Sequence, residues 1–142
     1  MISLLGINAV INKMQIILGL NQINPFIVDR RSKYAVTSFP TTSEDDFVAK
    51  IKLLLKDKKF RQADHNIVAY RIKNGDGRIL EYKNDGYNSP SKEIGAGVLM
   101  LEIMRKRQVE NICVVVTRWY GGVHLGADRF KHVRDATIEI LK

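Results

Sequence analysis

The period of the hydrophobic residues changes along the chain, and each period predicts a different element. In residues 33–39, apolar and polar side chains alternate up to Pro40, which predicts a strand. From residue 43, apolar side chains recur three and four positions apart, which predicts a helix ending in basic residues near position 61. Ser43 and Asp46 resemble a capping box, so this helix is expected to begin there.

A hairpin and a second helix follow. Residues 66–73 and 78–84 are rich in isoleucine, leucine and tyrosine, and the sequence Asn-Gly-Asp-Gly at 74–77 joins them. Asn-Gly and Asp-Gly pairs tolerate positive φ, so this stretch predicts a β-hairpin. After a polar loop, residues 94–107 are apolar almost all round and predict a deeply buried helix.

The last two elements are a strand and a C-terminal helix. Residues 111–117 are apolar without alternation, which is typical of a central strand buried on both faces. A helix is expected from near Gly126 to the end of the chain. The order is therefore β-α-β-β-α-β-α. It predicts an α+β domain of two layers, with helices packed on a mixed sheet of about four strands.

Residues 1–28 differ from this body because they carry a single charge, Lys13. No apolar run among them is longer than Ile16–Leu18, which is far too short for a membrane span. They also lack the basic start and the cleavage site of a secretory signal. We therefore expect a helical extension over residues 1–28, ended by Asn24-Pro25, and one domain over residues 29–142.

Composition indicates the kind of cellular compartment and the chemical class of partner. The chain has 142 residues, which suit one globular domain. Its one cysteine, Cys113, excludes a disulfide framework and a cysteine-rich zinc site, and it is typical of a reducing compartment, so a cytoplasmic location is expected. The net charge of +8 suggests an acidic partner such as nucleic acid, anionic lipid or an acidic protein face.

A basic patch at the end of the first predicted helix has two interpretations. It consists of Lys56, Lys58, Lys59 and Arg61. These cations either contact RNA or complement the negative end of the helix dipole, and we favour the dipole.

The sequence offers little for catalysis or metal binding. Cys113 lies mid-strand among valines, where a thiol is inert, and no G-x-S-x-G motif is present. His124, Asp128 and His132 are spaced four apart, but His124 lies in a glycine-flanked turn, so a metal site is not expected.

Nucleotide loops are not expected either. Gly121 and Gly126 have the spacing that opens a Walker A motif, but alanine and aspartate follow instead of lysine and serine or threonine. We therefore expect no cofactor, no metal and no catalytic residue. A hydrolase that uses His65 and Asp85 is the enzymatic alternative.

The most distinctive polar residues gather where the central strand ends. Arg118, Trp119 and Tyr120 are followed at once by Gly121 and Gly122. Glycines expose backbone amides, and arginine with aromatic side chains recognises nucleic-acid bases or protein hot spots. The alternative is a tight strand-to-helix turn whose aromatic side chains cover the core, and composition alone slightly favours that alternative.

Three blocks of the sequence resemble the IMPACT family. The first is Arg-Trp-Tyr-Gly-Gly at 118–122 with Leu-Gly at 125–126 and Asp-Arg-Phe-Lys-His at 128–132. The second is Ala-Asp-His-Asn at 63–66 with 69–72, and the third is Asn-Asp-Gly at 84–86 with Gly-Ala-Gly at 95–97. The resemblance covers residues 30–142. Its Trp-Tyr form is similar to eukaryotic members rather than to the bacterial YigZ-like relatives.

The resemblance implies the fold of the second domain of the fifth small-subunit ribosomal protein. It also implies a link to translational control without an established enzymatic activity. The better-known eukaryotic members act in the stress response to amino-acid starvation. They compete with the kinase that senses uncharged tRNA by binding its ribosome-associated activator. The candidate partner-binding positions that the resemblance transfers are His65, Asn66, Asp85, Gly86, Arg118, Trp119, Tyr120, Gly121, Gly122, Gly126, Asp128 and Arg129.

Two features depart from the family pattern. The glutamate that usually follows Asp-Gly is missing after Gly86, and the loop to Gly95 is longer. Residues 1–29 are too few for the RWD domain that contributes activator binding in eukaryotic members. We therefore expect a non-enzymatic module that binds a protein of the translation or stress-response machinery. Direct binding to RNA or to the ribosome is the alternative.

Overall fold

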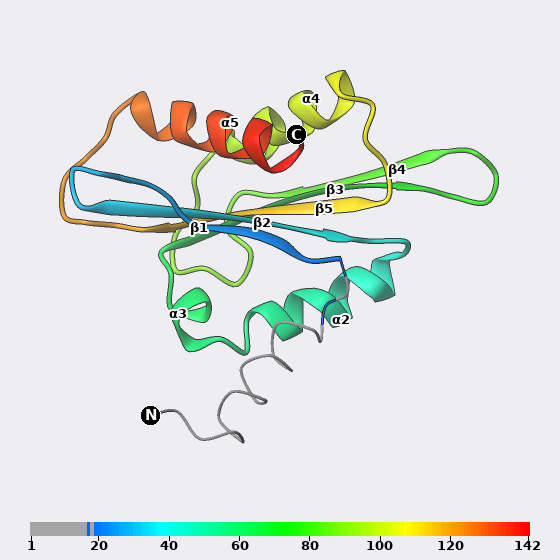
Figure 1. Cartoon of the computed structure of the whole chain (residues 1–142), viewed down its shortest axis with the longest axis horizontal. Coiled ribbons are helices and arrows are strands. Elements are labelled where there is room, and N and C mark those ends of the chain that lie inside the picture. Colours follow the sequence, from blue (N-terminus) through cyan, green and yellow to red (C-terminus); the bar gives the residue numbers. More distant parts are fainter. Residues whose placement is uncertain (1–16, 18) are drawn as a thin grey trace.

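The structure, a computed structural model, describes residue 17 and residues 19–142. They form a five-stranded antiparallel sheet with the strand order β1-β2-β5-β3-β4 (Figure 1). The strands are β1 (Asn21–Asp29), β2 (Ser32–Pro40), β3 (His65–Lys73), β4 (Ile79–Asn84) and β5 (Ile112–Trp119). The four strands predicted from residue 33 onward are confirmed, and the sheet is antiparallel throughout rather than mixed.

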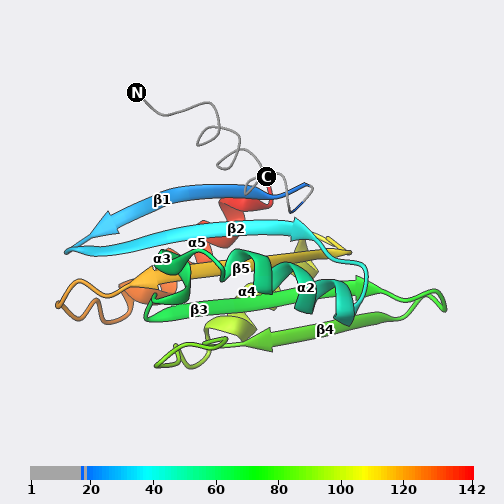
Figure 2. The same ribbon diagram turned by 90° about the horizontal axis from the view of Figure 1, so that it is seen from below.

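Helices cover both faces of the sheet, as the two views in Figures 1 and 2 show. Helices α4 (Ala96–Lys106) and α5 (Asp128–Ile140) lie on one face, and α2 (Glu44–Leu54) and the short α3 (Lys58–Arg61) lie on the other. The α+β class and the predicted order from β2 onward are confirmed. The two-layer description is incomplete, because both faces of the sheet are apolar and each needs its own covering layer.

Strand β5 shows why two covering layers are needed. It lies between β2 and β3, and its side chains point alternately to the two faces. Val114 and Val116 pack with α4 and α5, whereas Cys113 and Val115 pack with α2 and α3. Burial raises the pKa of the Cys113 thiol well above its ordinary value, which keeps it uncharged. The uninterrupted apolar run is thus a central strand, as predicted.

The segment before residue 29 differs from the expectation. Residues Asn21–Asp29 form a strand that pairs with β2, so the helix expected to reach Pro25 is wrong over these residues. Ile23, Phe26 and Ile27 pack against the core beneath α5, which draws the segment into the sheet. Proline is tolerated because β1 is an edge strand with an irregular register. Residues 17, 19 and 20 are not helical either. The remaining part of the expected extension, residues 1–16 and 18, lies outside the described residues.

The first helix is shorter than predicted. It begins after Ser43, whose hydroxyl oxygen accepts a hydrogen bond from the Asp46 amide at 3.0 Å, as the capping pattern predicts. It ends before the basic residues, most of which belong to α3. Arg61 donates from Nη1 to the carbonyl oxygens of Leu55 and Lys56, at 3.2 Å each. That contact supports the helix-dipole interpretation for Arg61.

Helix α4 is less buried than its composition suggests. Met100 and Met104 are fully buried, but Val98 is 40% exposed and Ile94, just before the helix, is 72% exposed. The expectation of deep burial is therefore wrong for the side that points away from the sheet. In the part of the chain that the structure describes, no helix combines the length and the apolar character needed to cross a membrane.

Candidate partner-binding site

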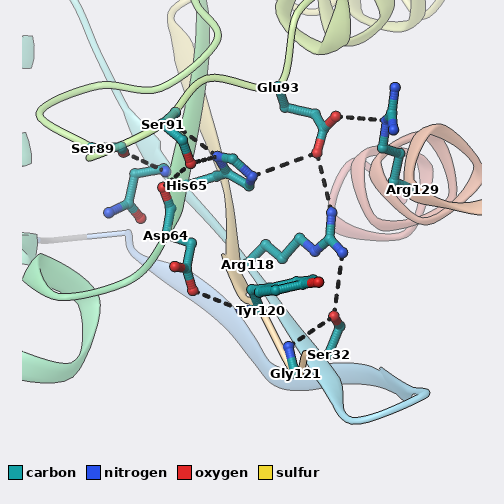
Figure 3. A network of polar contacts seen from close by, with 11 residues as sticks. Ser32, Asp64, His65, Ser89, Ser91, Glu93, Arg118, Tyr120, Gly121 and Arg129 are labelled. Carbon is teal, nitrogen blue, oxygen red and sulfur yellow. Dashed lines mark hydrogen bonds and ion pairs between the residues drawn. The ribbon is translucent and has the colours of Figure 1, made fainter. Parts of the chain in front are cut away.

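The buried carboxylate of Glu93 organises the polar residues at the end of the sheet where β3 begins and β5 ends (Figure 3). Arg118 Nη1 lies 3.2 Å from Oε2 of Glu93, and Arg129 Nε lies 2.8 Å from Oε1. His65 Nε2 lies 3.6 Å from Oε2. Glu93 is only 6% exposed, and a carboxylate is stable at such depth only when cations pair with it.

His65 is held on its other side by Ser91. Nδ1 of the imidazole lies 3.0 Å from the Ser91 carbonyl oxygen and 3.3 Å from the Ser91 hydroxyl oxygen. A carbonyl oxygen can only accept, so Nδ1 carries a proton and donates it. His65 therefore cannot take a proton from Ser91 through this nitrogen. At Nδ1, Ser91 therefore has no base that would activate its hydroxyl as a nucleophile.

Arg118 also connects the site to the turn between β1 and β2. Its Nη2 donates to the Ser32 hydroxyl oxygen at 3.3 Å, and the same oxygen accepts from the Gly121 amide at 3.2 Å. The guanidinium lies 5.6 Å from the ring centroids of both Tyr34 and Tyr120. These contacts leave Arg118 only 5% exposed. The structure thus places Arg118 as an anchor beneath the surface, not as the accessible recognition residue that the sequence suggests.

A surface pocket of about 250 Å³ opens beside this network. Tyr120, which is 43% exposed, forms its outer wall, and the Tyr120 ring centroid lies 5.7 Å from that of His124. Asp64 fixes this wall, because its Oδ2 accepts a hydrogen bond from the Tyr120 amide at 2.7 Å. The lining residues are Asp64, His65, Ser91, Glu93, Arg118, Tyr120, His124, Leu125 and Arg129.

Trp119 lies on the opposite face of the sheet from Arg118, because neighbouring residues of a strand point to opposite sides. Its Nε1 donates to the Lys59 carbonyl oxygen at 2.9 Å, and Lys33 Nζ lies 4.9 Å from the ring centroid. The predicted surface is therefore divided: Tyr120 joins Arg118 at the pocket, whereas Trp119 joins the basic patch. All four residues of that patch are exposed: Lys56, Lys58, Lys59 and Arg61.

Asp85 supports the pocket from behind. Its carboxylate accepts hydrogen bonds from the amides of Gly95 and Gly97, at 3.1 and 2.8 Å, and so caps the start of α4. This role fixes the position of Glu93, which lies just before the helix. Asp85 does not line the pocket with His65, so the geometry does not favour the hydrolase alternative.

Asn66 and Gly86 also support the site rather than form its surface. Asn66 is buried, its Nδ2 donates to the Phe60 carbonyl oxygen at 2.8 Å, and its Oδ1 accepts from the Thr117 hydroxyl at 2.7 Å. Gly86 lies so close to the Ser91 carbonyl that a Cβ atom would overlap it. The Asn66 backbone amide also donates to the Ser89 hydroxyl oxygen at 2.8 Å, so both residues belong to the framework that holds the loop carrying Ser91.

The glycines after β5 shape the loop that leads from Tyr120 to α5. Gly122 and Gly126 have φ of 90° and 57°, a region that favours glycine. Gly121 instead packs against the backbone of Arg31, where a side chain would not fit. Because the Gly121 amide already donates to Ser32, it is not a free donor for an anion.

A second group of ion pairs ties the β1–β2 turn to α5. His132 Nε2 lies 2.8 Å from Asp29 Oδ2, and Arg30 pairs with both Asp29 and Asp128. Arg30 has a φ of 46°, a strained value for a residue with a side chain, and these contacts offset that strain. Asp128 and His132 are thus held by separate partners and do not converge on His124. Among residue 17 and residues 19–142, no three acidic, histidine or cysteine side chains gather as a metal site.

The titration of Asp29 tests these contacts. Hydrogen bonds from Arg30 and His132 lower the pKa of Asp29 from 3.8 to about 2. A carboxyl group with a lowered pKa stabilises the fold above its unfolded-state pKa and loses that contribution as the pH falls through the folded value. An NMR titration of the Asp29 carboxyl carbon is expected to give a midpoint of about 2. Stability should decline below the unfolded pKa of 3.8, and less steeply in Asp29→Asn. A midpoint at or above 3.8 would show that the contacts do not form in solution.

Glu93 is the main residue that sequence reasoning missed. The usual position directly after Gly86 holds no acid, and the longer loop instead brings Glu93 to the centre of the site. Its amide donates to the Asp85 carbonyl oxygen at 3.0 Å. An acid just ahead of an apolar helix was the available signal. Ser32 and Asp64 were missed too: Ser32 belongs to no recognisable pattern, whereas Asp64 lies in the Ala-Asp-His-Asn block but was not carried over as a site residue.

Comparisons with known proteins show what the chain is similar to. The sequence model of the Impact N-terminal domain matches residues 30–141. The Protein IMPACT homolog of Caenorhabditis elegans is 36% identical over 119 residues, covering 81% of this chain and 44% of that protein. The Protein IMPACT homolog of Saccharomyces cerevisiae is 39% identical over 113 residues, covering 80% and 42%. The chain therefore spans less than half the length of these relatives.

Two solved structures share the fold. The two-domain translational regulator Yih1 has a TM-score of 0.55 and 38% identity, over 86% of this chain and 45% of that chain. A crystal structure described only as that of a hypothetical protein has a TM-score of 0.67 at 20% identity, over 87% and 57%, and shows likeness of fold alone. Since the family model matches most of the sequence and its relatives agree, this chain belongs to the Impact N-terminal domain family.

Proposed function

We propose that this chain is a non-enzymatic protein-binding module in translational control, and that its partner binds at the mouth of the pocket. The observation that carries the proposal is a contrast between the inside of the pocket and its rim. Inside, the charged groups pair with one another. At its mouth, the lining residue Tyr120 is 43% exposed, and Val123, the chain neighbour of the lining residue His124, is 36% exposed. Exposed aromatic and apolar side chains on a rigid support are typical anchors of protein interfaces.

The inside of the pocket is built for support rather than for chemistry. Both arginines are engaged by Glu93, and Asp64 is engaged by the backbone of Tyr120. His65 donates its Nδ1 proton to a carbonyl oxygen. A hydrolytic site needs a base that is free to accept a proton from a nucleophile, and this arrangement does not offer one at Ser91.

The relatives suggest the biological setting. Yih1 is described as a translational regulator, and the relatives from nematode and yeast carry the IMPACT name. We extend to this chain a role in the cytoplasmic response to amino-acid starvation, exerted through a ribosome-associated protein. The proposal concerns what this one family domain contributes by itself.

Capture of a tagged chain from nuclease-treated cell extract tests the proposal. Tyr120→Ala and Val123→Ala should each lower the recovery of translation proteins by about fivefold or more, because each removes an interface anchor. Leu80→Ala is the matched control, since Leu80 is 48% exposed but lies on β4 at the far edge of the sheet. Quantitative mass spectrometry measures recovery. Unchanged recovery with Tyr120→Ala, or an equal loss with Leu80→Ala, would count against this surface. A charge-reversing substitution of Arg118 would not test this surface, because the Arg118 side chain is buried beside Glu93.

RNA binding is the second candidate, and one observation favours it. Lys33 lies over the Trp119 ring, next to the exposed basic patch on the α3 side of the sheet. Cations beside an aromatic ring suit a nucleic-acid strand. In this case the captured partners would be lost on nuclease treatment, and binding would weaken steeply with salt because phosphate contacts release counterions.

A further inference from the structure

A groove of about 280 Å³ lies between α4 and α5, on the outer side of the molecule. Two half-buried isoleucines, Ile103 and Ile138, form its apolar part. Three exposed cations surround them: Lys106, Arg107 and Arg134. None of these five residues lines the pocket beside Glu93, so the groove is a separate feature.

The charged residues that line the groove are all basic. Its lining includes no acidic residue. In the part of the chain that the structure describes, Lys106 and Arg107 have no ion-pair partner, and Arg134 pairs only with its neighbour Asp135, at 3.3 Å. Lys106 and Arg107 lie at the C-terminal end of α4, where the helix dipole favours cations. Arg134 lies in the middle of α5, so the dipole does not explain it.

We propose that this groove binds an acidic amphipathic helix of a protein partner. An apolar floor between two helices suits the apolar side chains of a third helix, spaced three or four residues apart. The cationic rim suits glutamates and aspartates on either side of those anchors. The lining holds no aromatic side chain on which a base could stack, so it fits a helix better than a nucleic-acid strand. A second copy of this chain fits poorly, because each copy carries a net charge of +8.

An NMR titration of the full chain tests this inference, which does not depend on the function proposed above. The probe is a synthetic helical peptide with leucines at positions i and i+4 and glutamates around them. We expect saturable shifts at the amides of Ile103 and Ile138. Arg134→Glu should weaken binding by about tenfold or more, because it places an acid opposite the glutamates. Lys131→Glu is the matched control, since Lys131 is exposed on α5, carries the same charge and does not line the groove.

The other outcomes overturn the proposal. An equal loss with Lys131→Glu would indicate general charge attraction, and shifts confined to the pocket beside Glu93 would place the helix elsewhere. Tighter binding of a single-stranded RNA oligonucleotide at the same amides would assign the groove to nucleic acid. A dimer in analytical ultracentrifugation that Arg134→Glu abolishes would assign it to a second copy. Tyr120→Ala should leave peptide affinity unchanged, which separates this surface from the pocket.

Discussion

Replacing Glu93 with glutamine is expected to lower the free energy of unfolding by about 3 kcal/mol, because it leaves a buried arginine without its counter-charge. Arg118 is 5% exposed, and its Nη1 lies 3.2 Å from the Glu93 carboxylate. Glutamine keeps the size of the side chain and one acceptor oxygen but removes the charge. For a chain of this length the loss corresponds to a fall in melting temperature of about 10 °C.

Chemical denaturation of a double-mutant cycle measures this effect. In an Arg118→Met background, Glu93→Gln leaves no buried cation without a counter-charge. It should therefore lower the free energy of unfolding by less than about 1 kcal/mol. Glu139→Gln is the surface control: Glu139 pairs with Lys142 in solvent, and its loss should cost less than about 0.5 kcal/mol. A Glu93→Gln cost that is the same in both backgrounds would show that Glu93 does not hold Arg118.

Gly121→Ala is expected to lower the free energy of unfolding as much as Glu93→Gln does, but for a steric reason. A Cβ atom at Gly121 would overlap the backbone carbonyl group of Arg31 and the amide nitrogen of Ser32. Neither is the movable end of a side chain, so the β1–β2 turn must shift. That shift would break the contacts of Ser32 with the Gly121 amide and with Arg118. We expect a loss of about 3 kcal/mol, at the upper end of the usual cost of overpacking.

Gly75→Ala is the matched control for Gly121→Ala. Gly75 lies in the hairpin turn, does not have positive φ, and has no atom within 4 Å of the position of an added Cβ. Its substitution should leave the unfolding midpoint nearly unchanged. Equal midpoints for Gly121→Ala and the wild type would show that the turn does not pack against this loop in solution.

The strands and helices of the core could be predicted from the local sequence. Burial of one or both faces of an element gives its apolar residues a characteristic spacing. The valine run of β5 and the Asn-Gly-Asp-Gly turn needed no information from elsewhere in the chain. Strand β1 was missed because Pro25 and the polar residues around it are also compatible with the end of a helix. The position of β1 is set by its pairing with β2, and the local sequence contains no signal for that pairing.

The candidate site was predicted less well, because its residues are joined across long stretches of sequence. Glu93 and Arg118 are 25 positions apart, and Arg118 and Ser32 are 86 apart. The grouping of Arg118 with Trp119 on one surface was avoidable, because neighbouring residues of a strand point to opposite faces of the sheet. The framework roles of Asp85 and Asn66 were not avoidable, since a polar residue in a loop looks the same whether it binds a partner or caps a helix.

Site-directed photo-crosslinking in cell extract shows directly whether a protein binds at the mouth of the pocket. A photoreactive phenylalanine analogue replaces, one at a time, Val123 next to the lining residue His124, Lys58 in the basic patch and Leu80 on β4. We expect position 123 to crosslink to a protein of the translation apparatus and positions 58 and 80 not to do so. Crosslinks to RNA from position 58, with none from position 123, would contradict it.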